Sequence, residues 1–190
     1  MTEIPLPLTS IVSRLRSIGF PPFTDFQNHI KPLDIKASGE VMIIGAGDWL
    51  EEVALLEPKI IDGSIQSLTL IGTAKSLAIP IIDVFNKNYQ ISMKIDGTSY
   101  GTYFDNNPNQ LFDTIIFIGA TMLHPTDSLT YLAKQLKPSG NLYVTINSRN
   151  IPNLPLQIQN CTVKIIPDIP PSPDYNDFPQ YYGVVIKRQK

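Results

Sequence analysis

Residues 41–49 read Val41-Met42-Ile43-Ile44-Gly45-Ala46-Gly47-Asp48-Trp49, and this stretch decides the fold. Its four leading apolar residues predict a buried strand, and Gly45 and Gly47 permit a tight turn with close backbone approach. Asp48 then opens a segment that predicts a helix ending at Pro58. A strand, a glycine turn and a helix N-terminus together form the usual seat of a nucleotide-like ligand. Leu50 stands in the place of a third glycine, so a buried strand followed by an ordinary turn is the alternative interpretation.

The composition is that of a globular chain with few charges. The 190 residues suffice for one domain with a sizeable core, and 43% of them are apolar against 17% charged. A net charge of -2 argues against a dedicated nucleic-acid binder. The single cysteine, Cys161, allows no disulfide within the chain and indicates a reducing, cytoplasmic location. We expect no membrane partner, because no apolar run has spanning length and the N-terminus lacks a secretory pattern.

Strand and helix patterns alternate after the first strand. Strands are predicted over 67–72, 89–95, 112–118 and 141–146. The alternation of apolar and polar residues in 89–95 is typical of a sheet edge, whereas the nearly continuous apolar run 112–118 indicates a central strand buried on both faces. A helix is predicted before Lys137-Pro138-Ser139-Gly140, which would end it, and residues 98–110 are predicted to form a polar loop.

The first 37 residues are predicted to form a helix and a loop packed on this core. Apolar residues recur at helical spacing from Leu8 to Ile18, and Thr9 or Ser10 can cap the helix start. Packing of an amphipathic helix on the domain is one interpretation, and a lid over a binding cleft is the other. Residues 20–32 are predicted to form a loop whose aromatic side chains cover a pocket or fill a gap in the core. We expect His29 to be exposed in this loop.

The C-terminal part contains two strands without a helix between them. Residues 162–166 and 182–186 predict an antiparallel pair, joined by a loop rich in proline, acidic and aromatic residues. Its candidates for an acceptor pocket are Asp168, Asp174, Tyr175, Asp177, Tyr181 and Tyr182. A solvated, proline-stiffened loop or a partner-binding loop is the alternative. Alternating strands and helices followed by such a pair predict an α/β fold, with a mostly parallel sheet and helices on both faces.

Three blocks make the chain resemble the class I S-adenosylmethionine-dependent methyltransferases. Residues 41–47 resemble the family's first motif, and residues 112–125, with their Leu-His-Pro ending, resemble its fourth-strand block. Residues 132–144 resemble the fifth-strand block, in which a lysine, a proline and a glycine precede the strand. The order and spacing agree over residues 38–187. The resemblance therefore implies a methyltransferase-like α/β domain over 38–190, with a Rossmann-like seven-stranded sheet and an antiparallel C-terminal strand.

The resemblance also implies S-adenosylmethionine as cofactor. Gly45 and Gly47 match the glycine turn under its methionine part, Asp96 matches the acidic residue that faces the adenine amine, and Gly119 matches the start of the loop beneath the cofactor. The complete set of implied cofactor-binding residues is Gly45, Ala46, Gly47, Gly72, Asp96, Gly97 and Gly119.

Besides Trp49, which stands where the family commonly has a third glycine, two positions depart from the family pattern. Ile43 stands where the family has an acidic residue in the first strand, and Gly72 stands where an acidic residue grips the ribose. The loss of a charge-assisted pair to the ribose costs about 1.5–3 kcal/mol of binding. Neighbouring side chains that could substitute are Asp48, Asp62 and Thr73.

Methyl transfer from a sulfonium asks for alignment and exclusion of water, and a general base is optional. His124 is the candidate base, with a structural histidine as the alternative. No metal constellation is visible in the sequence, which has two distant histidines and one cysteine. Two functions therefore compete: a methyltransferase acting on a small-molecule acceptor, and a catalytically inactive partner or ligand-binding protein of the same fold. Leu50 and Gly72 break the fingerprint of a nicotinamide-dependent oxidoreductase.

Overall fold

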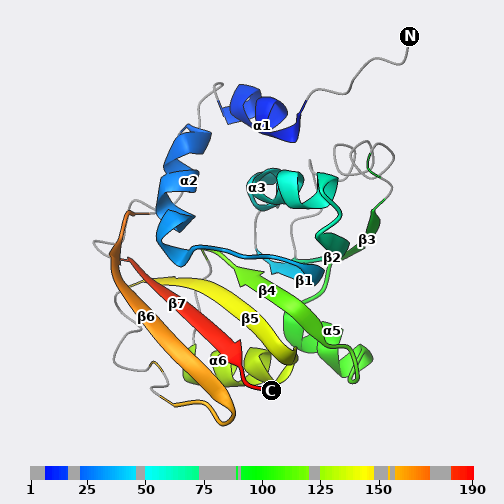
Figure 1. The fold of residues 1–190 in the computed structure, drawn as a ribbon, viewed down its shortest axis with the longest axis vertical. Helices are drawn as coiled ribbons and strands as arrows, with labels where there is room; N and C mark the ends of the chain where they lie inside the picture. Colours follow the sequence, from blue (N-terminus) through cyan, green and yellow to red (C-terminus); the bar gives the residue numbers. More distant parts are fainter. Residues whose placement is uncertain are drawn as a thin grey trace.

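The computed structural model describes residues 7–16, 22–45, 50–72, 89, 91–119, 125–147, 154, 157–171 and 181–190. These residues contain a seven-stranded sheet in the order β3-β2-β1-β4-β5-β7-β6 (Figure 1). Five strands run parallel: β1 (Gly39–Ile44), β2 (Ile65–Ile71), β3 (Ser92–Asp96), β4 (Phe112–Phe117) and β5 (Leu136–Asn147). The last two, β6 (Cys161–Ile169) and β7 (Tyr181–Arg188), pair antiparallel, and β7 is also antiparallel to β5. The predicted Rossmann-like α/β fold is confirmed.

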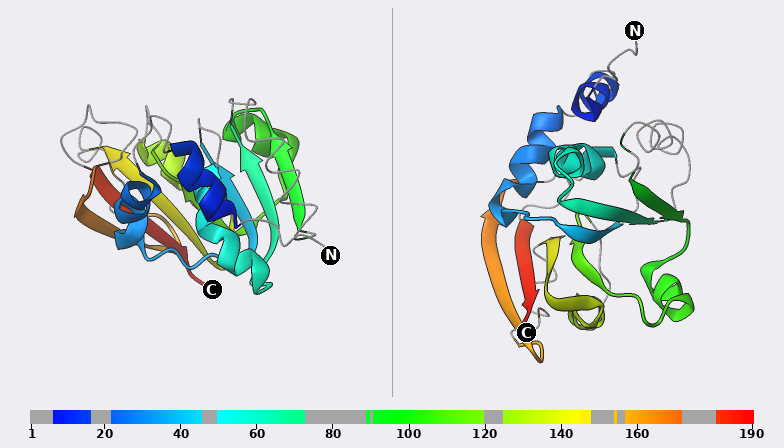
Figure 2. Two further views of the ribbon diagram at one scale, coloured as in Figure 1. Left: turned by 90° about the horizontal axis from the view of Figure 1, so that it is seen from above. Right: turned by 45° about the vertical axis from the view of Figure 1, so that its right-hand side comes forward.

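In the described part of the chain, four helical segments cover one face of the sheet. They are α1 (Leu8–Arg16), α2 (Phe23–Ile30), the 3-10 turn η1 (Lys31–Leu33) and α3 (Leu50–Ile61). Val41 and Ile43 of β1 point to this side and share a core cluster with residues of all four segments. Figure 1 shows α1, α2 and α3 above the sheet, and Figure 2 shows the same layering from two further directions.

The other face is covered by α5 (Tyr100–Asn106) and α6 (Pro125–Lys134). Met42 and Ile44, which alternate with Val41 and Ile43 along β1, join the core cluster on this side. This alternation explains the unbroken apolar run of the first strand, because a strand between two helical layers buries both of its faces. Within the described residues, no helix is long and apolar enough to span a membrane.

Two segments predicted as loops contain helices. Phe23–Ile30 forms α2, with Phe23, Phe26 and Ile30 buried at helical spacing. Tyr100–Asn106 forms α5, which starts where the Ser99 side chain accepts a hydrogen bond from the Thr102 N–H. Both helices have eight residues or fewer, and helices of that length owe their stability to tertiary packing more than to propensity.

Two proline-containing boundaries were predicted wrongly. Pro58 lies inside α3, which continues to Ile61, so the buried face of the helix outweighs the hydrogen bond that proline removes. Pro138 and its neighbours, predicted to end a helix, already belong to β5.

The start of α1 is held by α3. The buried Glu57 carboxylate accepts hydrogen bonds from the N–H of Leu8 (2.9 Å) and of Thr9 (3.4 Å). The hydroxyl of Tyr89 donates to the same carboxylate over 3.1 Å. A carboxylate at a helix N-terminus satisfies free N–H groups and complements the helix dipole. Glu57, and not Thr9 or Ser10 as predicted, therefore caps the N-terminus of α1.

Candidate functional site

The carboxyl ends of the parallel strands line up at one edge of the sheet. In the strand register, Ile44 lies beside Ile71 and Phe117, and Ile71 lies beside Asp96. The next residue along each chain is therefore at the same edge. Gly45 donates its N–H to the Ile71 carbonyl over 3.0 Å, and Gly72 donates to the Asp96 carbonyl over 3.1 Å. In an open α/β sheet, this edge is where ligands bind.

The structure thus brings together five of the predicted site residues, namely Gly45, Gly72, Asp96, Gly97 and Gly119, as strand ends or the residues that follow them. Ala46, Gly47 and the candidate base His124 lie outside the described residues, as do Asp48 and Thr73. Among the residues that the structure does describe, no cluster of His, Cys, Asp and Glu could hold a metal ion.

Asp96 is half-buried at the end of the edge strand β3. Its Oδ1 accepts hydrogen bonds from the Thr98 N–H (3.0 Å) and from the Thr98 hydroxyl (2.6 Å). These bonds close the turn into α5 and fix the orientation of the carboxylate. Asp96 therefore has a structural role in this turn, and Thr98 supports the orientation of its carboxylate.

Gly119 leaves β4 in a left-handed conformation, with φ +68°. Its N–H donates to Oγ1 of Thr145 on β5 over 2.8 Å, and Thr145 is 1% exposed. The Thr145 side chain on β5 thereby holds Gly119, just after the neighbouring strand β4, in place. Thr145 was missed in the sequence, because this contact depends on the β4–β5 register, although a polar residue inside a buried strand is itself a signal.

An aromatic cluster flanks the edge on the α5 and α6 side. The Tyr100 hydroxyl donates to Ser128 Oγ over 2.9 Å, and the Tyr100 ring meets Phe117 edge-on at 5.8 Å between centroids. Tyr131 packs at 6.3 Å from the same ring, and burial raises the pKa of Tyr131. The cluster joins the first turns of both helices to the end of β4, next to Gly119.

The two departures from the expected pattern are visible in the structure. Ile43 is fully buried in the core, where an acidic side chain would have no water. Gly72 follows directly after β2 and has no side chain. Asp62 cannot replace the missing acid, because it lies after the C-terminal end of α3, where it accepts from the Ser64 N–H and pairs with Lys59. That prediction for Asp62 was wrong.

The expectation that His29 is exposed was also wrong. The ring is completely buried on α2, and Nδ1 lies 2.6 Å from the Pro170 carbonyl, to which it donates. Tyr181 meets the ring edge-on at 5.2 Å. Because Tyr181 pairs with Asn147 at the end of β5, His29 connects α2 to Pro170, just after β6, and to the first residue of β7 at the carboxyl edge.

The candidate acceptor residues of the C-terminal loop are only partly described. Asp168 is exposed with φ +53°, Tyr181 is buried, and Tyr182 is half-buried. Asp174, Tyr175 and Asp177 lie outside the described residues.

Solved structures share this fold. A candidate O-methyltransferase from Klebsiella pneumoniae superposes with a TM-score of 0.60 at 9% identity, over 100% of this chain and 93% of that one. The plantazolicin methyltransferase BpumL in complex with SAH gives 0.57 at 15% identity, over 95% and 90%. An rRNA methylase from Streptococcus thermophilus gives 0.53 at 10% identity, over 85% and 94%. No protein-family model and no curated protein matches the sequence. The chain therefore has the fold of class I methyltransferases.

Proposed function

We propose that this chain is an S-adenosylmethionine-dependent methyltransferase with a small-molecule acceptor. The observation that carries the proposal is the strand register, which sets Gly45, Gly72, Gly97 and the β4 loop at Gly119 along one edge. The fold shared with a methyltransferase solved in complex with SAH supports the same reading.

The residues at this edge fit the cofactor in part. Glycine at three adjoining strand ends lets a ligand approach the backbone closely. The Asp96 carboxylate, held in place by Thr98, is an acceptor suited to an exocyclic amine. Tyr100, which follows β3 at the start of α5 and is half-buried, gives this edge an aromatic ring for a planar base. The ribose side is the weak part, since Gly72 offers no carboxylate for the diol.

The cofactor, when bound, supplies a methyl group on a positively charged sulfur that needs little further activation. The work left to the chain is to orient the two partners and to exclude water. Gly45 and the anchored Gly119 loop would hold the methionine end, whereas Asp96 would hold the base. His124 is the proposed acceptor-side base.

A catalytically inactive, ligand-binding or partner protein of the same fold is the second candidate. Gly72 and Ile43 favour it, because both remove a charged contact that the family uses.

Isothermal titration calorimetry of the full chain with S-adenosylmethionine and with S-adenosylhomocysteine tests the proposal. We expect micromolar dissociation constants, weakened about tenfold in Asp96→Asn, which keeps an oxygen for both Thr98 bonds but removes the charge. Asp62→Asn at the far end of α3 is the matched control and should bind like the wild type. Absence of heat at millimolar ligand would contradict cofactor binding. Binding without methyl transfer in a screen of small acceptors would favour the inactive candidate.

A further inference from the structure

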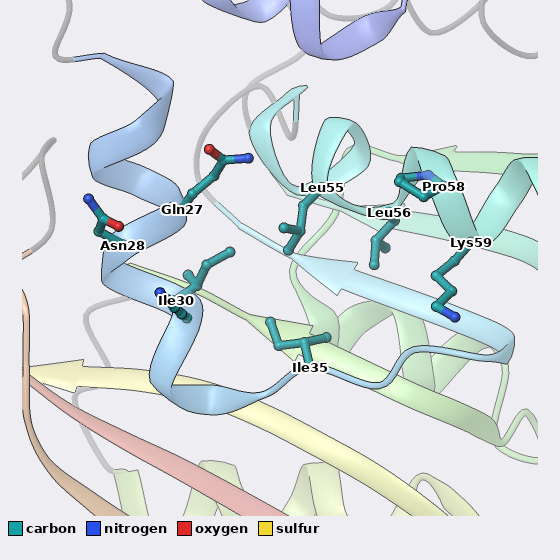
Figure 3. A pocket seen from close by; sticks show the side chains of 9 residues that line it. Gln27, Asn28, Ile30, Ile35, Leu55, Leu56, Pro58 and Lys59 are labelled. Carbon is teal, nitrogen blue, oxygen red and sulfur yellow. The ribbon is translucent and has the colours of Figure 1, made fainter.

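A cavity of about 530 Å³ opens between α2 and the C-terminal half of α3 (Figure 3). This volume lies within the range of small-molecule sites, roughly 300–1,000 Å³. The cavity is lined by Gln27, Asn28, Ile30, Lys31, Ile35, Leu55, Leu56, Pro58 and Lys59. Lys59 lies ~13 Å along the helix axis from Leu50, the first residue after the glycine turn. None of the residues described above at the carboxyl edge of the sheet lines this cavity.

The inner wall of the cavity is apolar. Ile30 and Leu56 are buried, and Ile35 and Leu55 are half-buried. Figure 3 shows Leu55 and Leu56 pointing from α3 toward Ile35 on the other side of the space. Pro58 adds an apolar ring and has no N–H. Such a wall favours the hydrocarbon part of a ligand, because filling it removes apolar surface from water.

The rim of the cavity is basic. Lys31 and Lys59 are exposed, one from each side. The Lys59 ammonium lies 3.6 Å from the Asp62 carboxylate, with both side chains about half exposed, which makes a weak surface pair. Asp34, the acidic residue nearest to Lys31 in sequence, pairs with Lys36 at 3.0 Å. The rim therefore has positive charge to offer to an anion.

We propose that this cavity binds an anionic amphiphile, namely a carboxylate with an unbranched apolar chain. The chain lies against Ile35, Leu55 and Leu56, and the exposed Lys31 and Lys59 at the rim attract the carboxylate. Gln27, whose amide points across the opening in Figure 3, closes the entrance. The lining shares no residue with the proposed cofactor site.

The test is calorimetric titration of the full chain with sodium decanoate below its micelle concentration. We expect saturable one-to-one binding, weakened at least about tenfold by the exposed double reversal Lys31→Glu/Lys59→Glu. The matched control Lys164→Glu/Lys187→Glu changes the net charge equally on the exposed part of β6 and β7 and should bind like the wild type. Gln27→Trp, at an exposed position, should abolish binding by plugging the entrance.

Two control ligands with the same chain length, the cation decyltrimethylammonium and the uncharged decanol, distinguish the contribution of the negative charge to binding from that of the apolar chain. The proposal requires both to bind at least about tenfold more weakly than decanoate. Equal binding of the cation, equal loss in both charge-reversal pairs, or non-saturable heats would overturn it. So would a self-associating wild-type chain that Gln27→Trp converts to monomers, because the cavity would then be an interface between two copies.

Discussion

The amino and carboxyl edges of the parallel sheet differ in how their polar groups are used. At the amino ends of β1, β4 and β5, Lys137 Nζ lies 2.9 Å from both Glu40 Oε2 and Asp113 Oδ2. The Asp113 carboxylate also accepts from the Glu40 N–H over 2.8 Å. At the carboxyl ends, glycines follow β1, β2 and β3. The Asp96 carboxylate accepts hydrogen bonds from Thr98, and the Thr145 hydroxyl accepts one from the Gly119 N–H.

At the amino edge, the charged side chains are paired with one another and the backbone is tightly packed, whereas the carboxyl edge has glycines after its strands. A Cβ on Gly140 would lie 2.9–3.0 Å from three backbone carbonyl oxygens, so the amino edge is packed tightly in its backbone as well. Charges that satisfy one another stabilise the fold and have little left for a ligand. At the other edge, the residues that follow β1, β2 and β3 are glycines, which have no side chain to keep a ligand away from the backbone. The comparison predicts that substitutions at the amino edge change stability without changing the ligand site, whereas those at the carboxyl edge change binding, with or without a loss of stability.

Gly39→Ala should give the largest effect. Gly39 has φ +67°, and a Cβ there would lie 2.3 Å from Asp113 Oδ2. Left-handed strain and the clash together should lower the free energy of unfolding by about 3 kcal/mol. Urea denaturation measures this. Gly63→Ala is the control, because Gly63 has φ +74° with nothing within 4 Å of the added Cβ, and it should cost about 1 kcal/mol. Equal costs would show that the amino edge is not tightly packed.

Thr145→Val tests the anchor of the β4 loop. The substitution preserves shape but leaves the Gly119 N–H without its acceptor, which should cost about 2 kcal/mol. We expect weaker binding of S-adenosylhomocysteine in calorimetry, together with a lower melting temperature. Thr145→Ser retains the hydroxyl and should recover most of the affinity. If Thr145→Val binds as tightly as the wild type, the loop does not contribute to the site.

Gly72→Asp should improve ligand binding at the carboxyl edge. A carboxylate at the end of β2 can accept hydrogen bonds from the ribose diol, which should tighten S-adenosylhomocysteine binding about tenfold. Gly72→Asn is the uncharged control and should gain less. Unchanged or weaker binding of the folded Gly72→Asp variant would place the ribose elsewhere.

Alkaline titration of stability should show the smallest effect. The hydrogen bonds to Glu40 and Asp113 raise the pKa of Lys137 above its ordinary 10.5. A raised pKa in the folded state stabilises the fold below pH 10.5, and this stabilisation is lost as the pH rises through the folded value. Lys137→Met should therefore lose less stability than the wild type above pH 10.5. The exposed control Lys164→Met should follow the wild-type curve, and a parallel course of all three would contradict the prediction.

The sheet could be predicted from the sequence because its signals are local. The continuous apolar run of β4 predicts a strand buried on both faces, and the alternation of apolar and polar residues over 89–95 predicts the edge strand β3. The absence of a helical pattern between the last two strands predicts their antiparallel pairing. The helices α2 and α5 could not be predicted in this way. Their flanking prolines and polar residues favour loops, and the burial of Phe26 or Phe104 that stabilises them comes from the rest of the fold.

The same distinction holds for the site. Gly45 and Gly72 each follow a strand, and Asp96 is the last residue of one. The positions of the strands in the sequence therefore suffice to predict that these three residues lie at one edge of the sheet. The supporting contacts of Thr145 and the burial of His29 could not be predicted, since they join segments far apart in the chain. Register and tertiary packing decide such contacts.

Hydrogen–deuterium exchange with and without saturating S-adenosylhomocysteine tests the contrast between the two edges most directly. We predict slower exchange of the amides at Gly45, Gly97 and Gly119 in the complex, with no change at Glu40 and Asn141 near the amino ends. Slower exchange confined to the amino ends, or the same small change at both edges, would contradict the assignment of the carboxyl edge as the ligand site.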